Sequence, residues 1–299
     1  MTRLVLWGTL MGTVIAVIAF GVYWWWFQAE SVRSEDIVYG QRDSKDLVLN
    51  VFQPPEPNGA GVILMVSGGW KSGPDSIRPF MFAPFVRRGY TVFAVQHLSQ
   101  PECLIGNIVA DVQRSVRFIR HHAADYHVNP DRLGVIGGSS GGHLSLMIGT
   151  CGDAGNPEAA DPVERESSQV QCVACFYPPT DLLNLKGSTE DTGDGGPPRS
   201  FKRGFGPLAQ EMSSWKKLGR ELSPIYHITP MMPPTMIVHG DADTLVPIDQ
   251  SERFVKEAGQ HNCNVRFEIR PGKGHGWPTM VLDIIAFADW FDAHLMSEE

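Results

Sequence analysis

The sequence predicts an α/β protein built on a mostly parallel, doubly wound sheet of about eight strands, preceded by a transmembrane helix. Short apolar runs alternate along the chain with stretches in which apolar residues have helical spacing. An uncharged run of residues stands before this alternation begins. We therefore expect two regions, a membrane anchor over residues 1–30 and one large domain over residues 31–299.

The predicted anchor rests on residues Leu4 to Phe27, which contain no charged side chain. As a helix this run would be about 36 Å long, enough to cross a hydrocarbon core of about 30 Å. It is longer than the apolar part of a cleaved signal peptide, and no small-residue cleavage site follows it. Arg3 precedes the run, whereas acidic residues follow it, which favours a cytoplasmic N-terminus. The sequence thus predicts a single-pass membrane protein whose large domain lies on the exported side, periplasmic or extracellular.

The strands of the large domain are predicted from two patterns. Residues Lys45 to Phe52 alternate with period two, like a half-exposed antiparallel strand, and are expected to pair with residues 36–40. Residues 265–269 alternate apolar and charged side chains, as an edge strand does. Other runs are almost wholly apolar, which suits parallel strands buried on both faces: Val62–Val66, Thr91–Val95, Leu133–Ile136, Val170–Phe176 and Thr235–Val238.

Helices are expected between these strands. Apolar residues from Ile105 to Ile119 have helical spacing, and a second such stripe lies near the C-terminus, from Val281 to Phe291. Residues 186–206 interrupt the alternation because they are rich in Gly, Ser, Asp and Pro. Together with the residues that follow, they are predicted to form a flexible or cap insertion over about 186–222.

Composition and charge exclude several classes of function. The formal net charge of −8 disfavours a nucleic-acid partner, because phosphate binding needs a basic surface. Cys172 and Cys175 have redox-motif spacing, but within a strand residues three apart face opposite sides. The five cysteines are therefore expected to be mainly free thiols, with a disulfide that uses Cys151 left open. We expect no metal site and no cofactor.

The most specific motif is Gly-Gly-Ser-Ser-Gly-Gly-His-Leu at residues 137–144, which directly follows an apolar strand and opens a helical pattern. A strand, a tight Gly-x-Ser-x-Gly turn and a helix together form the nucleophile elbow of serine hydrolases. Two reading frames fit this pattern, one with Ser139 as the nucleophile and one with Ser140.

This segment resembles the Gly-x-Ser-Ala-Gly-Gly-His/Asn-Leu elbow of α/β-hydrolase superfamily serine esterases. The acetyl-esterase-like and prolyl-oligopeptidase-like branches are the most similar. The resemblance covers roughly residues 37–297 and implies the α/β-hydrolase fold. It selects Ser139 as the nucleophile over Ser140.

A serine nucleophile needs a base, and the base needs an orienting carboxylate, here expected in the chain order Ser, Asp/Glu, His. The segment after residue 238 resembles the family's His-Gly-x-x-Asp-x-x-Val-Pro, which assigns the acid to Asp243. Asp241 is a rival that more naturally shapes the turn. Residues 272–276 resemble the family's Gly-x-Gly-His-Gly turn, which makes His275 the base.

The run Val62–Val66 leads into Ser67-Gly68-Gly69-Trp70, which resembles the His-Gly-Gly-Gly-Trp oxyanion loop of these esterases. Val66 replaces the family's His and Ser67 its first Gly, which leaves open how the loop is anchored. The donors are backbone N–H groups, so the side-chain changes do not remove them. The resemblance implies the following donors: Gly68, Gly69, Trp70 and, after the nucleophile, Ser140.

The resemblance implies a membrane-anchored hydrolase that cleaves carboxylic esters of small molecules or carbohydrates, with short acyl groups, through an acyl-enzyme. Two alternatives remain open at this stage. One is a serine exopeptidase of the prolyl-oligopeptidase type, although the chain has no room for the propeller that such enzymes usually carry. The other is a noncatalytic binding module on the same fold.

Overall fold

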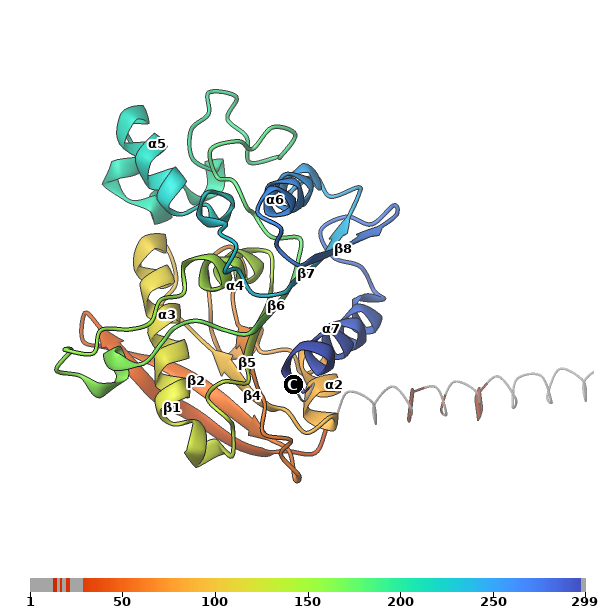
Figure 1. Ribbon diagram of the computed structural model, residues 1–299. Helices are drawn as coiled ribbons and strands as arrows, with labels where there is room; N and C mark the ends of the chain where they lie inside the picture. The colour runs from red at the N-terminus through yellow and green to blue at the C-terminus, as the bar shows by residue number, and fades with distance from the viewer. Residues whose placement is uncertain (1–12, 15–16, 18–19, 22–28, 297–299) are drawn as a thin grey trace, which may run out of the picture.

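The computed structural model describes residues 13–14, 17, 20–21 and 29–296. Its centre is one eight-stranded sheet with the spatial order β1-β2-β4-β3-β5-β6-β7-β8 (Figure 1). The strands are β1 (Val32–Arg42), β2 (Lys45–Gln53), β3 (Gly61–Met65), β4 (Thr91–Val95), β5 (Leu133–Gly138), β6 (Cys172–Phe176), β7 (Thr235–Gly240) and β8 (Val265–Arg270).

The sheet is antiparallel at one edge and parallel elsewhere. β1 pairs with β2, and β2 with β4, in antiparallel register, whereas all pairs from β4 to β8 are parallel. The inner strands β3, β4, β5, β6 and β7 are buried along nearly their whole length, as their unbroken apolar runs predict. β8 alternates between exposed and half-buried residues, as predicted for an edge strand. The predicted mostly parallel, eight-stranded sheet is therefore confirmed.

Helices cover both faces of the sheet, so that two separate hydrophobic clusters form. Helices α3 (Ile105–His121), α4 (Ser140–Cys151) and α6 (Asp249–Gln260) bury their apolar stripes in one cluster. Helices α2 (Ala83–Arg87) and α7 (Met280–Leu295) contribute to the other. Figure 1 shows α3 and α4 on one side of the strands, with α7 and α2 on the other.

Residues 177–234, between β6 and β7, contain the predicted insertion. Its ordered pieces are the short helical turns η5 (Arg199–Phe205) and η6 (Pro207–Ala209) and the helix α5 (Met212–Glu221). Trp215 of α5 is fully buried against Phe205, and both side chains belong to the hydrophobic cluster formed by α3, α4 and α6, so this segment packs onto the main domain. Figure 1 shows α5 beyond the ends of the strands, on the same side of the sheet as α3.

One part of the predicted fold is corrected. Within residues 13–14, 17, 20–21 and 29–296, no helix has the length and the apolar character that crossing a membrane requires. This finding overturns the predicted N-terminal transmembrane helix and with it the single-pass membrane localisation with an exported domain. Most of the run Leu4–Phe27 lies outside the described residues.

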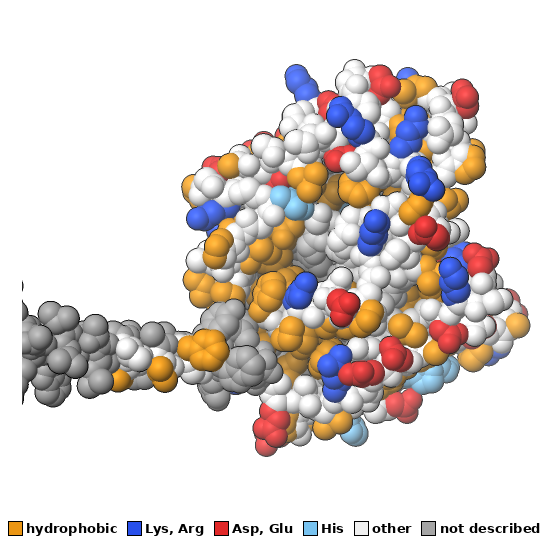
Figure 2. All heavy atoms as spheres, turned by 180° about the vertical axis from the view of Figure 1, so that it is seen from behind, with side chains coloured by type: hydrophobic (Ala, Val, Ile, Leu, Met, Phe, Trp, Pro, Cys, Tyr) orange, Lys and Arg blue, Asp and Glu red, His pale blue; other side chains and the backbone are white. Residues whose placement is uncertain are grey.

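The five cysteines are free thiols. Cys172 and Cys175 lie in β6 and are fully buried, and burial raises the pKa of both thiols well above the ordinary value. On the face seen in Figure 2, Lys and Arg side chains are interspersed with Asp and Glu, in keeping with the acidic net charge.

Candidate active site

Ser139 occupies the turn between β5 and α4 and has a strained backbone conformation, with φ 55° and ψ −123°. A non-glycine residue with positive φ is uncommon and is found at sites where the surrounding structure holds it in place. The Ser139 N–H donates to the carbonyl of Phe176 at the end of β6 (3.0 Å), and the Ser139 carbonyl accepts from His143 in α4 (2.9 Å). This turn has the geometry that the sequence predicts for a nucleophile elbow, and it places Ser139 at the carboxyl end of the strands.

The elbow requires glycine at position 137 because the chain folds back on itself there. A Cβ at Gly137 would lie 2.3 Å from the Gly141 carbonyl oxygen. That oxygen belongs to the backbone, so it cannot move away by a change of rotamer. At the neighbouring Gly138, the nearest atom to an added Cβ is the Tyr177 hydroxyl, at an ordinary 3.6 Å.

We expect Gly137→Ala to lower the free energy of unfolding by at least about 2 kcal/mol, because overpacked interiors lose roughly 1–3 kcal/mol even where side chains can adjust. Gly138→Ala is the matched control and should unfold within about 0.5 kcal/mol of the parent protein. Urea denaturation of the two variants measures the difference. Equal stabilities would contradict this account of the elbow.

His275 lies on the loop after β8 and connects Ser139 to Asp243. Its Nε2 is 2.9 Å from the Ser139 Oγ, and its Nδ1 is 2.7 Å from the Asp243 Oδ2. The Asp243 side chain is fully buried, whereas the His275 side chain keeps about a fifth of its surface exposed. The structure thus brings three residues from the ends of β5, β7 and β8 into one hydrogen-bonded line, in the arrangement of a Ser-His-Asp triad.

The Asp243 carboxylate is fixed from both sides. Its Oδ1 accepts the backbone N–H groups of Leu245 (2.9 Å) and Val246 (3.0 Å), which leaves Oδ2 for His275. Burial disfavours the charge, but His239, His275 and the Val246 N–H together outweigh it and hold the pKa of Asp243 well below its usual range. Asp243 is therefore ionised near neutral pH and can stabilise a positive charge on His275.

Asp241, the rival acid, has a different role. It is exposed, and its Oδ1 accepts the backbone N–H of Gly272 (2.6 Å) on the turn after β8. His239 is buried beneath Asp243, with its Nε2 2.8 Å from the Val246 carbonyl oxygen and its Nδ1 2.7 Å from the Ser251 hydroxyl. Among the described residues, no group of three or more His, Cys, Asp or Glu is arranged to hold a metal ion.

The segment Ser67–Trp70 forms a tight turn next to Ser139. Gly69 and Trp70 both have positive φ, 58° and 54°, so that the backbone reverses direction within two residues. The Gly68 N–H donates to the Lys71 carbonyl (2.9 Å), whereas within the described chain no acceptor faces the N–H groups of Gly69 and Trp70. Within the described residues, the N–H groups of Gly69 and Trp70 therefore remain available to bind an oxygen atom next to Ser139, and Ser140 begins α4 directly after it.

His97 and Ser67 explain how the turn is anchored without the family's usual histidine. The His97 Nδ1 donates to the carbonyl of Leu98 (2.8 Å), so that its Nε2 is left to accept the Ser67 hydroxyl (2.9 Å). The Ser67 oxygen lies 3.1 Å from the hydroxyl of Ser140. Burial lowers the pKa of His97, which keeps the ring neutral at pH 7. Gln100 completes the anchor, because its backbone and side-chain N–H groups bind the last two carbonyls of the turn.

The side chain of Trp70 is held by a second histidine, His143 of α4. The Trp70 indole N–H donates to the His143 Nδ1 (3.2 Å), and the His143 Nε2 donates to the Leu222 carbonyl (2.7 Å). Burial lowers the pKa of His143 to about 4, so the ring stays neutral and keeps this polarity. The indole also packs edge-on against Phe201 and Phe205 of the insertion. The insertion, the turn and the elbow therefore support one another.

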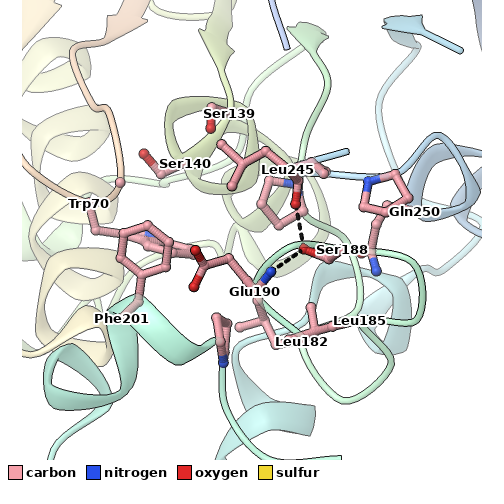
Figure 3. A pocket seen from close by; sticks show the side chains of 15 residues that line it. Trp70, Ser139, Ser140, Leu182, Leu185, Ser188, Glu190, Phe201, Leu245 and Gln250 are labelled. Atoms are coloured by element: carbon pink, nitrogen blue, oxygen red, sulfur yellow. Dashed lines mark hydrogen bonds between the residues drawn. The ribbon is translucent and has the colours of Figure 1, made fainter. Parts of the chain in front are cut away.

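Two cavities flank Ser139. One is small, about 80 Å³, and is enclosed mainly by apolar side chains of the insertion and of the loop after β7 (Figure 3). The other is an open cleft of about 470 Å³, lined by apolar residues and by polar or charged residues that include Ser67, Arg78 and His275. His275 lines the cleft and does not line the small pocket.

Sequence reasoning missed several residues of this site. Tyr177 follows β6 directly and packs against His275 with tilted rings whose centres are 4.3 Å apart. Burial raises the pKa of Tyr177 to about 12. Its position after a buried strand, next to the strand of the nucleophile, was the available signal. His97 and the anchoring role of the Ser67 hydroxyl were missed because they depend on contacts between segments far apart in the sequence.

The comparisons with known proteins agree with this geometry. The BD-FAE family model matches residues 49–257. Esterase LipQ of Mycobacterium tuberculosis is 26% identical over 83% of this chain and 58% of its own length. A probable isoprenylcysteine alpha-carbonyl methylesterase of Arabidopsis thaliana is 24% identical over 85% of this chain and 52% of its own. The chain thus spans between half and three-fifths of the length of these relatives.

Solved structures give the same fold. A truncated carbohydrate esterase from gut microbiota superposes with a TM-score of 0.74 at 22% identity, covering 89% of this chain and 97% of that one. Esterase 2 of Thermogutta terrifontis superposes with a TM-score of 0.67 at 24% identity, covering 87% and 91%. The predicted resemblance to α/β-hydrolase serine esterases is confirmed, and the chain belongs to the BD-FAE family.

Proposed function

We propose that this protein hydrolyses carboxylic esters through an acyl-enzyme formed on Ser139. One observation carries the proposal: the continuous line of hydrogen bonds from Ser139 through His275 to a buried, ionised Asp243. A serine hydroxyl is a weak nucleophile by itself and gains reactivity from a base that is oriented in this way. The esterase names of the relatives and of the similar structures support the same reaction.

In this mechanism the Ser139 Oγ attacks the ester carbonyl carbon while the His275 Nε2 takes the hydroxyl proton. The carbonyl oxygen becomes an oxyanion and receives hydrogen bonds from the N–H groups of Gly69, Trp70 and Ser140. His275 then gives its proton to the alcohol oxygen, the carbon–oxygen bond breaks, and the acyl group stays on Ser139. Water then attacks the acyl carbon while His275 takes its proton. The bond between that carbon and the Ser139 Oγ breaks, His275 returns the proton to the Ser139 Oγ, and the acid is released. No cofactor takes part in these steps.

Each of the two cavities is proposed to bind one part of the ester. His275 must protonate the departing alcohol, so the alcohol lies in the open cleft that His275 lines. The acyl group then enters the small apolar pocket on the other side of Ser139, whose volume of about 80 Å³ admits only a short chain. The cleft is large and polar enough for a polar alcohol such as a carbohydrate.

A fluorophosphonate probe with an ester panel tests the proposal. We expect covalent labelling of the protein at Ser139 and turnover of acetyl and butyryl esters of one alcohol, with little turnover of octanoyl esters. Aminoacyl anilides serve as the peptidase arm of the panel. Cleavage of anilides without ester turnover would support an exopeptidase instead, and a protein that neither reacts with the probe nor cleaves esters would be a binding module.

A further inference from the structure

The small apolar pocket beside Ser139, called the acyl pocket from here on, has one charged side chain among otherwise uncharged lining residues. Glu190 lines the pocket with Ser139 and Ser140, and the other lining residues are uncharged and mostly apolar. Figure 3 shows the Glu190 carboxylate pointing into the pocket beside the ring of Phe201. Glu190 belongs to the insertion, and the residue is only partly exposed.

The position of this carboxylate is set by local hydrogen bonds. Its two oxygens accept the backbone N–H of Ser200 (2.6 Å) and the Ser200 hydroxyl (2.9 Å). The Glu190 N–H donates to the Ser188 hydroxyl (3.0 Å), which itself donates to the carbonyl of Leu245 (2.6 Å). The carboxylate is therefore held by Ser200 within the insertion, and the Glu190 backbone is connected through Ser188 to the loop that follows β7.

The charge of Glu190 has no counterpart in the described chain. Its two partner groups from Ser200 are neutral, and no Lys, Arg or His of the described residues lies within ion-pair distance of it. A carboxylate offers about four acceptor sites, so two remain free beyond the Ser200 bonds. In the unliganded pocket, water can satisfy them.

An acyl group that enters the pocket must displace that water. A plain alkyl chain would leave the carboxylate with unsatisfied acceptors and no compensating contact, which disfavours binding. A protonated amine would supply both N–H donors and the opposite charge, and such charge-assisted bonds are stronger in a poorly hydrated site. The geometry points to an acyl pocket selective for short acyl groups that carry a protonated amine, with Glu190 as the residue that recognises it.

This inference rests on the proposed ester hydrolysis and on placing the acyl group away from His275. It goes beyond both, because it names the chemical class of the acyl group. The apolar walls bind the carbon chain, Glu190 binds the ammonium group, and the small volume limits the chain length.

The test compares methyl esters of butyric, 2-aminobutyric and 3-aminobutyric acid near pH 7, where at least the 3-amino group is protonated. We expect the parent protein to prefer an amine-bearing ester over the butyrate ester in kcat/KM. Glu190→Gln keeps the size and an acceptor for Ser200, but it removes the charge. It should lower kcat/KM for the amine-bearing ester about tenfold or more and raise it for methyl butyrate.

Asp191→Asn is the matched control, since it removes a neighbouring carboxylate that does not line the pocket. It should leave the ratio between the two kinds of ester unchanged. If Glu190→Gln changes all esters equally, or if the parent protein prefers methyl butyrate, Glu190 only ties the loops together and the inference is wrong. Turnover of methyl butyrate by either protein keeps the proposed function intact, so the two failures are distinguishable.

Discussion

Replacing Ser139 with alanine is expected to abolish acyl-enzyme formation and to lower kcat for ester hydrolysis by about 10⁴-fold or more. The Ser139 hydroxyl lies within hydrogen-bond distance of the His275 Nε2, and among the described residues no other hydroxyl forms a hydrogen bond with that nitrogen. In the described part of the chain, the Ser139 hydroxyl hydrogen-bonds only to the His275 Nε2, so the loss of this side chain should leave the fold intact. Loss of fluorophosphonate labelling, with an unchanged thermal midpoint, is the measurement.

Ser140→Ala provides the control for the second reading frame. Its hydroxyl contacts the Ser67 oxygen (3.1 Å) and is directed toward the oxyanion turn, whereas its proposed contribution to catalysis is the backbone N–H. Alanine retains that N–H, so we expect kcat to fall by about tenfold or less. A dead Ser140→Ala variant beside an active Ser139→Ala variant would show that the nucleophile is assigned one residue too early.

Most of the fold could be predicted because the buried parallel strands leave a strong trace in sequence. Runs such as Val62–Val66 and Thr91–Val95 have no polar residue in the middle, and only a strand covered on both faces buries every side chain. The order of the strands in the sheet is a different matter. It depends on contacts between segments far apart, such as β3 lying between β4 and β5, which no local pattern records.

Local patterns also failed at the N-terminus. An uncharged run of 24 residues, Leu4–Phe27, satisfied the hydropathy rule for a membrane span, yet no such helix is found in the part of the chain that the structure describes. Hydropathy measures the composition of a segment alone.

The candidate site was predictable to the extent that its residues follow strands directly. Ser139, Asp243 and His275 lie in short glycine-containing turns at the carboxyl ends of three strands, so motif and position coincide. The walls of the acyl pocket come instead from the insertion between β6 and β7. The insertion is rich in turn-forming residues and has no periodicity, so its sequence does not indicate that Glu190 or Phe201 lines a pocket. Phe201 reaches the site because the insertion packs against Trp70.

Asp243→Asn is expected to lower kcat by at least about 10²-fold while the protein remains folded. The amide keeps the size of the carboxylate and can still accept from the Leu245 and Val246 N–H groups through one oxygen. It then presents an NH₂ group to the His275 Nδ1, which favours the tautomer with the proton on Nε2, and that nitrogen can no longer accept the Ser139 proton. In a serine protease with the same triad, the corresponding change lowers kcat by about 10⁴.

Asp241→Asn separates this catalytic effect from a general loss of negative charge after β7. Asp241 is exposed and binds only the Gly272 N–H among the described residues, a bond that an asparagine oxygen can also accept. We therefore expect kcat to fall by about tenfold or less, with a pH profile like that of the parent protein. Because both variants remove one charge from the same loop, a loss in Asp243→Asn that is at least about tenfold larger than the loss in Asp241→Asn cannot be due to charge alone. It reflects the bonds of the buried Asp243 carboxylate, foremost the one to His275. Equal losses in the two variants would instead mean that the loop tolerates neither change, and Asp243 would lose its assignment as the orienting acid.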